Sequence, residues 1–383
     1  MIFILGSVYN TVMSRKTAHG NGGGDSRTAD SSIDRRTVLQ SGAAVVGGLS
    51  LAGCISDNGG GGGSGTQVTI ISSPAGFDDQ AFNDNALSGL QEASDEWDVN
   101  INQVEATNQS EYPQRQADAA EAGPDLIVMV GNQHTEPLRS NAPEYPDVNW
   151  MLINNHVDEP NVSGWIEMNH QMSFLAGVGA GTLTQEQIEN AGSSTDPSGS
   201  TVGFVGGEQI PLIEAFEVSY QQGVAWVDDS IEVLTGYGGS FSDPSGVNDQ
   251  AVSQIESGAD IVWHAAAAAG EGAFQAASDN GRFAIGVDSD QSVAFDSYQD
   301  VILGSAIKAL NEATYEVTGA VVEDNWESVQ GEQNLSVDGG QIDWVTGQAF
   351  EGSMPDSLDQ NIQDAKDAIV NGDIDFECGP TGC

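Results

Sequence analysis

The chain has 383 residues, of which 57 are acidic and only 10 are basic, so its formal net charge at pH 7 is −47. A protein of this sign is repelled by phosphate backbones, which excludes nucleic acid as a partner. Apolar residues still make up 39% of the sequence and recur in periodic runs, which favours a folded core over disorder. Because dissolved salt screens such a charge, the composition predicts a halophilic protein.

Residues 1–53 have the pattern of a twin-arginine export signal. Arg35 and Arg36 precede a short, weakly apolar stretch that ends in LAGC at Leu51–Cys54 and is too short to span a bilayer. The LAGC box resembles a lipobox, in which the chain is cut before the cysteine and the thiol carries lipid. A buried helix hairpin of a cytoplasmic protein is the competing interpretation. The sequence therefore predicts a mature chain that starts at Cys54 and is lipid-anchored on the extracytoplasmic face of the cell membrane.

A glycine-rich tether is predicted at residues 54–66, because Gly59–Gly63 is an unbroken glycine run with no side chains that pack. Three acidic and five basic residues precede Cys54, which leaves 54 acidic and five basic residues and a net charge of −49 in the mature chain. So few cations make each one informative. They are Arg115, Arg139, Arg282, Lys308 and Lys366.

The folded body alternates between short apolar runs and helical patterns, which is typical of parallel strands covered by helices on both faces. In the first half we expect strands at 67–72, 99–104, 125–130 and 148–153, and helices at 83–96 and 112–122. In the second half we expect strands at 201–205, 231–236, 260–264 and 282–287, and helices at 173–184, 211–227, 248–257 and 270–280. The fold class is therefore α/β with doubly wound parallel sheets. Ligands of such sheets bind beyond the carboxyl ends of the strands, which are rich in glycine and polar residues here.

Two cysteines remain at the C-terminus, Cys378 and Cys383, on either side of Gly379 and Pro380. Outside the cytoplasm such a pair can close a small disulfide loop, and the sequence leaves open whether it does. A metal site needs more ligands at suitable spacing, so none is predicted.

Several ordered motifs resemble the basic membrane protein family. They are GFDDQAFN at 76–83, FLAGVGAG at 174–181, GFVGGEQIPLIEAFEVSYQQGV at 203–224, GYGGSFSDP at 236–244, AIGVDSDQ at 284–291 and SLDQNIQDAKDAIVNGDIDF at 357–376. Members of that family are lipid-anchored substrate-binding proteins of ABC importers, and the characterised members bind nucleosides. The resemblance covers nearly all of residues 67 to 376.

The resemblance implies a type I periplasmic-binding-protein fold, with two lobes, a three-strand hinge and a ligand between the lobes. It places the crossings between lobes near Phe174, Asp290 and Trp326. The expected division is lobe 1 at 67–174 plus 291–325, lobe 2 at 175–290 plus 326–350, and a C-terminal helix and tail at 351–383.

The resemblance also implies ligand contacts in the N-terminal half. The family often reads DKSFN where this chain has DQAFN, so Asp79, Phe82 and Asn83 are candidates, with Phe82 stacking on a base. Phe82 as the first core residue of its helix is the alternative. The family's GFxxxD appears here as GNQHTE, with its aromatic residue and its Asp replaced. Glu136 at the end of this motif is a candidate acceptor for a base N–H.

Three more candidates come from the C-terminal half. Phe241 is expected to be a second stacking ring, and Asp288 matches the acid that holds the ribose hydroxyls. Lys308 matches a family lysine that contacts the ribose. Its retention in a chain almost without lysines also indicates a function.

The predicted function is capture of a nucleoside, most simply a purine, for an ABC importer. The expected partners are the small-molecule ligand, the permease subunits and the membrane, with no cofactor. A sugar or another small ligand, delivered to a transporter or a chemoreceptor, is the alternative. The sequence has no G-x-S-x-G, H-E-x-x-H or P-loop motif, so no enzyme activity is expected, and His264 is expected to contact ligand rather than act as a base.

Overall fold

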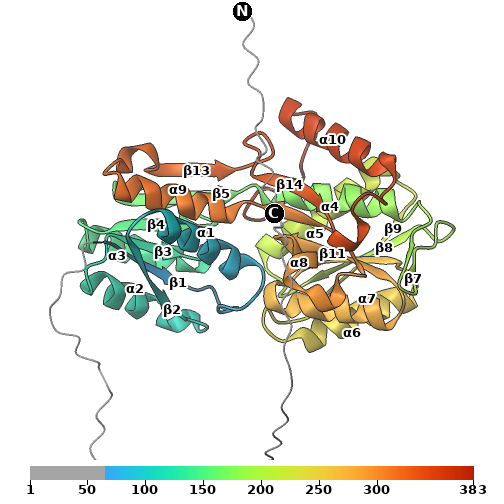
Figure 1. Cartoon of the computed structure of the whole chain (residues 1–383), viewed down its shortest axis with the longest axis horizontal. Helices are drawn as coiled ribbons and strands as arrows, with labels where there is room; N and C mark the ends of the chain where they lie inside the picture. Colours follow the sequence, from blue (N-terminus) through green and yellow to red (C-terminus); the bar gives the residue numbers. More distant parts are fainter. Residues whose placement is uncertain (1–64) are drawn as a thin grey trace, which may run out of the picture. The chain divides into compact units, whose positions relative to one another are not determined.

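The computed structural model describes residues 65–383 (Figure 1). The predicted export signal, the lipidation site at Cys54 and nearly all of the tether lie outside the described residues. Two six-stranded sheets organise the described chain, and we call the elements around each of them lobe 1 and lobe 2. Within the described residues, no helix is both long enough and apolar enough to cross a membrane.

Lobe 1 is built on a sheet with the strand order β13-β5-β4-β3-β1-β2, in which all neighbours are parallel. The strands are β1 (Thr66–Ile71), β2 (Val99–Val104), β3 (Leu126–Met129), β4 (Asn149–Ile153), β5 (Val162–Glu167) and β13 (Gly331–Leu335). The helices are α1 (Phe82–Glu96), α2 (Tyr112–Glu121), α3 (Thr135–Glu144) and α9 (Leu310–Val322).

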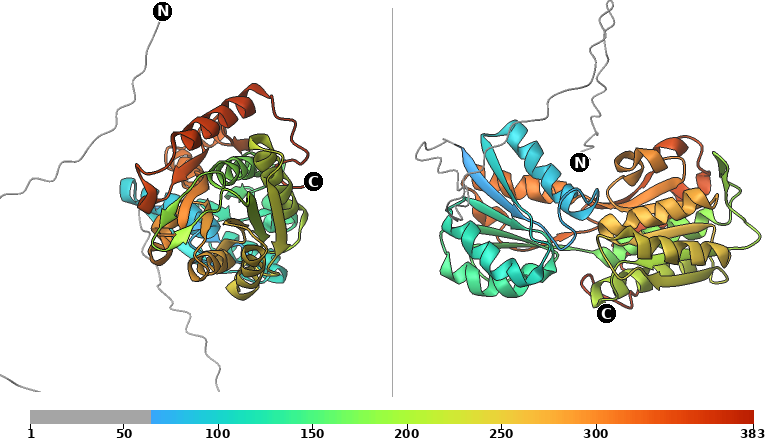
Figure 2. Two further views of the ribbon diagram at one scale, coloured as in Figure 1. Left: turned by 90° about the vertical axis from the view of Figure 1, so that its right-hand side faces the viewer. Right: turned by 90° about the horizontal axis from the view of Figure 1, so that it is seen from below.

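Alternate side chains of the lobe 1 strands face different helix pairs. Leu126 and Val128 of β3 belong to the core beneath α1 and α9, whereas Ile127 and Met129 belong to the core beneath α2 and α3. Successive side chains of a strand point to opposite faces, so a strand that is apolar at every position is buried on both. The prediction of parallel strands covered on both faces is confirmed for this sheet (Figure 2).

Lobe 2 has the strand order β14-β12-β11-β10-β8-β9. Its strands are β8 (Thr201–Gly206), β9 (Glu232–Tyr237), β10 (Ile261–Ala265), β11 (Phe283–Asp288), β12 (Ile302–Lys308) and β14 (Ile342–Thr346), and only β14 runs antiparallel to its neighbour. Its helices are α4 (Asn169–Leu183), α5 (Pro211–Val227), α6 (Pro244–Glu256), α7 (Glu271–Asp279), α8 (Gln291–Ala294) and α10 (Asp356–Asn371). A separate short hairpin pairs β6 (Glu189–Asn190) with β7 (Ser193–Ser194).

Helix α4 is buried at every position except Gln171, which explains the glycine-rich FLAGVGAG motif. A Cβ on Gly177 would lie 2.2 Å from the carbonyl oxygen of Tyr220, and one on Gly223 would lie 2.1 Å from that of Phe174. Helices α4 and α5 therefore pack backbone to backbone, and only glycine permits this approach.

The chain crosses between the lobes three times, as predicted, but at different residues. It enters lobe 2 at Asn169, and β12 then pairs with β11, so it stays in lobe 2 up to Lys308 rather than leaving near Asp290. Helix α9 packs on α1 and β13 pairs with β5, so the chain remains in lobe 1 beyond Trp326 (Figure 1). The last crossing lies between β13 and β14.

The displaced crossing near Asp290 has a physical cause. The sequence ILGSAIK at 302–308 was not predicted as a strand, because Gly304, Ser305 and Lys308 interrupt its apolar run. In the structure this segment is a central strand of lobe 2, and six of its seven residues are buried.

Candidate functional site

A pocket with about 640 Å³ of unoccupied space lies at the carboxyl ends of parallel strands from both sheets. Ser73 follows β1, Gly131 follows β3, Asn154 follows β4, and Asp288 and Lys308 end β11 and β12. This is where open α/β sheets bind ligands. Apolar side chains form most of the remaining lining: Pro74, Ala75, Phe82, Ile210, Leu212, Ile213, Phe216, Phe241, Ala265, Ala266, Ala267 and Val287.

A buried charge cluster lies at one side of this pocket. The Lys308 ammonium is 3.2 Å from Asp288 Oδ1 and 3.6 Å from Glu167 Oε2, and it lies 4.6 Å from the centroid of the Phe82 ring. It also donates a hydrogen bond of 3.1 Å to Asn169 Oδ1. Lys308 is 3% exposed and Glu167 is fully buried, so water screens little of this attraction.

The cluster shifts the pKa values of Lys308 and Glu167. Burial lowers the pKa of Lys308, but the Asp288 and Glu167 carboxylates together outweigh burial, so the pKa is raised and the amine stays charged. Burial raises the pKa of Glu167 to about 7, with a further rise from Asp288 and an opposing effect of Lys308. One ammonium therefore faces two buried acids, and Glu167 takes up a proton near neutral pH.

An unsatisfied acceptor in the cluster points to a ligand that donates hydrogen bonds. Asp288 Oδ1 is buried and has no hydrogen-bond partner apart from the ion-pair contact, and Asp288 lines the pocket. Buried polar atoms in native proteins are nearly always satisfied, so an orphan acceptor in a pocket wall is available to a ligand donor. Glu167 faces Lys308 and Asn169 instead, and it lies behind the wall rather than in it.

Three of the lining residues have a left-handed backbone that is uncommon outside glycine: Asn154 at φ 70°, Ala267 at φ 47° and Asp288 at φ 70°. Such conformations persist only where the surroundings enforce them, and they gather at ligand sites. At Asp288 the enforcing group is Asn85 of α1, whose amide donates to the carbonyl oxygens of Asp288 (3.1 Å) and Lys308 (2.9 Å). A lobe 1 side chain thus holds the two lobe 2 strand ends that carry the charges.

Four of the seven predicted ligand contacts line the pocket: Phe82, Phe241, Asp288 and Lys308. Phe82 lies at the start of α1 in lobe 1, and Phe241 lies between β9 and α6 in lobe 2. The structure therefore brings an aromatic ring from each lobe to the same pocket as the charge pair. Phe216 of α5 adds a third ring, which the sequence did not single out.

Asp79 and Asn83 do not line the pocket, and instead they brace the loop that carries Phe82. Asp79 accepts hydrogen bonds from the backbone N–H groups of Ala81, Asn83 and Asp84 at 3.0–3.1 Å. Asn83 bonds both the backbone N–H and the hydroxyl of Ser73 at 2.8 Å. Burial raises the pKa of Asp79 to about 6 against the opposing effect of these hydrogen bonds.

Glu136 lies away from the pocket, on the outer surface of α3. Its side chain is 84% exposed and pairs with Arg139 at 3.2 Å. The loop after β3 presents Gly131, Asn132 and Gln133 to the pocket instead. Helix α3 begins at Thr135, so Glu136 already belongs to the helix. His264 is also absent from the lining, because it is fully buried with Nε2 2.9 Å from Gln291 Oε1.

Sequence reasoning missed Glu167, Asn169, Asn154 and Phe216. Glu167 is the last residue of β5, a strand that was not predicted because Ser163 and Gly164 weaken its apolar pattern. The available signal was an acid at the end of an otherwise apolar segment. Because Glu is rarely buried without a partner, such an acid indicates a buried ion pair.

The comparisons with known proteins agree with this arrangement. Residues 66–342 match the family model described as ABC transporter substrate-binding protein PnrA-like. The chain is 26% identical over 365 residues to the ABC transporter nucleoside-binding protein BmpA of Lactococcus lactis, covering 90% of this chain and 97% of that one. It is 28% identical over 222 residues to basic membrane protein A of Borreliella burgdorferi, covering 56% of this chain and 61% of the relative. The chain thus spans about three fifths of the length of this relative.

The fold has a counterpart among solved structures. An ABC transporter solute-binding protein from Aeropyrum pernix superposes with a TM-score of 0.70 at 22% identity, covering 81% of this chain and 92% of that chain. The predicted two-lobed solute-binding fold is confirmed. The match over residues 66–342 covers every strand of both sheets except β14 and every strand end that builds the pocket, so the chain belongs to the PnrA-like family of ABC transporter substrate-binding proteins.

Proposed function

We propose that this protein binds a nucleoside, preferably a purine nucleoside, in the pocket between its lobes and delivers it to the permease of an ABC importer. The observation that carries the proposal is the pairing of an orphan carboxylate oxygen on Asp288 and the buried Lys308 with Phe82 and Phe241 in one otherwise apolar pocket. The name of the lactococcal relative, a nucleoside-binding protein, supports it.

Each part of a nucleoside has a matching part of the pocket. A flat base presents two apolar faces to the aromatic rings, and stacking on such a ring is worth about 1–3 kcal/mol per base. A ribose diol supplies two hydroxyl donors, and one carboxylate such as Asp288 accepts both. Lys308 holds Asp288 in place and places a positive charge beside the sugar oxygens. The side-chain amides of Asn132 and Gln133 supply donors and acceptors for the polar edge of a base.

A sugar is the second candidate, because Asp288 and Lys308 serve a diol whether or not a base is attached. Glu136 is far from the lining, so no acid from the loop after β3 marks a base edge. We expect the ligand to leave chemically unchanged, as delivery to a permease requires.

Titration calorimetry in molar salt tests the proposal with guanosine, adenosine, inosine, uridine, ribose and free bases. We expect purine nucleosides to bind most tightly and Asp288→Ala to weaken binding by about 1–3 kcal/mol, since the sugar hydroxyls lose their acceptor. Glu136→Gln is the matched control, because it removes an acid of the same chain that lies outside the pocket. Tight binding of ribose alone assigns the site to sugars, and no binding of any of these compounds refutes both candidates.

We also propose that lipid on Cys54 anchors the mature chain on the extracytoplasmic face of the membrane and that the protein works in high salt. Cys54→Ser should release the protein from the membrane fraction or leave it unprocessed, and full retention after processing argues against lipidation. All five cations of the described residues already contact acids or carbonyls, so the excess acids depend on dissolved cations. Thermal melts should fall from molar salt to about 0.1 M, and a flat profile contradicts the halophilic assignment.

A further inference from the structure

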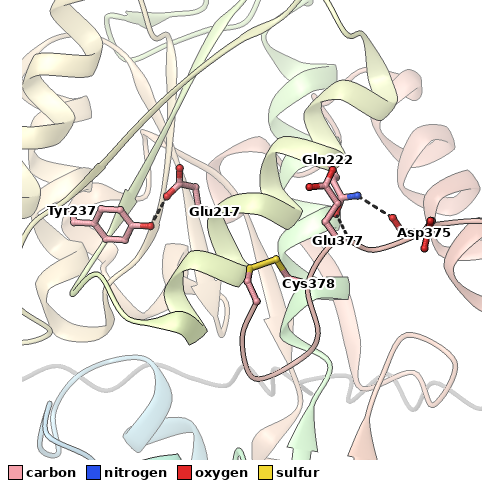
Figure 3. The surroundings of a disulfide bond; sticks show 7 residues. Glu217, Gln222, Tyr237, Asp375, Glu377 and Cys378 are labelled. Atoms are coloured by element: carbon pink, nitrogen blue, oxygen red, sulfur yellow. Dashed lines mark hydrogen bonds between the residues drawn. A yellow bond between two sulfur atoms is a disulfide. The ribbon is translucent and has the colours of Figure 1, made fainter.

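The C-terminal tail runs from α10 across α4 and α5 and is fixed at several points. The Gln222 side chain donates to the Asp375 carbonyl at 3.1 Å and accepts from the Glu377 backbone N–H at 3.3 Å (Figure 3). The Phe376 ring packs edge-on against His170 at 4.6 Å between centroids. The tail is therefore docked on lobe 2 up to the first cysteine.

A disulfide between Cys378 and Cys383 closes the tail into a small loop (Figure 3). Inside the loop, the Gly379 N–H donates to the Gly382 carbonyl at 3.0 Å. The loop also contacts lobe 2, where the Pro380 carbonyl accepts a hydrogen bond of 3.2 Å from Asn169 Nδ2. Its sequence left open whether the cysteines pair, and the structure shows that they do.

Asn169 is the side chain through which this loop reaches the pocket. It is the first residue of α4, at the point where the chain crosses from lobe 1, and it is fully buried. Its Oδ1 accepts from the Lys308 ammonium at 3.1 Å, and its Nδ2 donates to Asn154 Oδ1 at 3.1 Å as well as to Pro380. Asn154 and Lys308 both line the pocket, one from each lobe.

These contacts leave the Asn169 amide a single satisfied orientation. Lys308 has only donors and a backbone carbonyl has only acceptors, so Oδ1 has to face Lys308 and Nδ2 has to face Pro380. Without the carbonyl, the Asn169 amide keeps only Asn154 and Glu167 as acceptors, and the constraint on Oδ1 weakens. The carbonyl itself is kept in position by the loop that the disulfide closes.

We propose that the disulfide loop at 378–383 is a positioning element of the ligand site, which orients Asn169 and through it Lys308. The inference rests on the proposed function, because it assigns the loop a role in ligand affinity. Asn169 is a positioning residue in this scheme, since it contacts the binding lysine rather than the ligand.

Calorimetry with the best-bound of guanosine, adenosine, inosine and uridine tests the coupling. We expect Cys378→Ser/Cys383→Ser to weaken binding about 2- to 10-fold, which is the range of one net hydrogen bond. In an Asn169→Ala background the same cysteine changes should alter affinity less than about twofold, because the link is already cut. An equal loss in both backgrounds, or no loss in the wild-type background, overturns the proposal.

A phosphine reductant supplies a second perturbation without mutation. The phosphine is oxidised to its oxide while the disulfide becomes two thiols, with one water molecule supplying the oxide oxygen and both thiol protons. It should weaken binding by the wild type but not by the double serine variant. An effect of the reductant on both proteins contradicts the proposal.

A ligand-free readout separates this proposal from the proposed function. In ¹⁵N-edited spectra of the full protein, the Asn169 side-chain amide should shift when the disulfide is reduced. An unmoved Asn169 amide overturns the positioning role even if no nucleoside binds, whereas absent binding with a shifted amide refutes only the nucleoside assignment.

Discussion

The two lobes contribute to the pocket in different ways. Lobe 2 contributes Asp288 and Lys308, which are the last residues of β11 and β12 and are fixed by strand pairing. Lobe 1 contributes mostly loop residues, such as Ser73, Asn132 and Gln133. A residue that ends a parallel strand has a predictable place, whereas a shift of a few residues within a loop moves a side chain from the pocket to the surface.

Removing the positive charge of Lys308 in lobe 2 should have the largest effect on the stability of the fold. Lys308→Met leaves Asp288 and Glu167 buried without their counter-charge, which should reduce the free energy of unfolding by about 3–5 kcal/mol above pH 7. Denaturant titration in molar salt measures it. Lys366→Met is the matched control, because its pair with Asp343 is partly exposed and is expected to contribute less than about 1 kcal/mol. Equal losses in the two variants would show that the burial of the cluster carries no energetic weight.

Glu167, the last residue of β5 in lobe 1, should make the free energy of unfolding depend on pH by up to about 3 kcal/mol. The pKa of Glu167 is about 7 in the folded protein, above that of an ordinary Glu at 4.5, so the unfolded chain releases this proton first as the pH rises. Protonated Glu167 therefore stabilises the folded protein at low pH, and this contribution is lost as the pH rises from about 4.5 through 7. Glu167→Gln should remove this dependence.

The difference between wild type and Glu167→Gln isolates the effect of that acid. Asp79 and Asp260 also have pKa values raised by burial, to about 6, and they contribute equally to both proteins. Unfolding free energies at pH 5, 6, 7 and 8 provide the measurement. A constant difference between the two proteins over this range would mean that Glu167 is ionised throughout.

Removing the aromatic rings of Phe82 and Phe241 tests whether both lobes contact the ligand. Phe82→Ala in lobe 1 and Phe241→Ala in lobe 2 should each weaken nucleoside binding by about 1–3 kcal/mol, because each removes a stacking surface from a different side. Calorimetry gives both values, and Trp226→Ala is a control ring that is 38% exposed and outside the pocket. A loss confined to one of the two phenylalanines would assign the base to that lobe alone.

The smallest effect should come from Glu136→Gln. Its carboxylate is exposed and pairs only with Arg139 of the same helix, so stability should change by less than about 0.5 kcal/mol and ligand affinity should not change. A loss of affinity in this variant would show that the loop after β3 moves toward the ligand on binding.

The sequence sufficed to predict the secondary structure wherever the apolar pattern was unbroken. The fully buried LIVM of β3 is one example, and α5, which has the predicted bounds 211–227, is another. It failed where tertiary contacts satisfy polar residues inside strands. In β5 the Ser163 hydroxyl donates to the Val329 carbonyl at 2.6 Å, and in β12 the Ser305 hydroxyl accepts from the Gln291 N–H at 3.1 Å. Both partners are remote in sequence, so no local pattern revealed these strands or the buried Glu167.

The placement of the crossings has a consequence for biosynthesis. Neither lobe is a continuous segment, because α9 and β13 complete lobe 1 and β14 completes lobe 2 only after residue 308. A ribosome therefore has to translate most of the chain before α1 meets its partner helix α9 and before β12 gains its neighbour β14. Both cores therefore close late in synthesis and almost together.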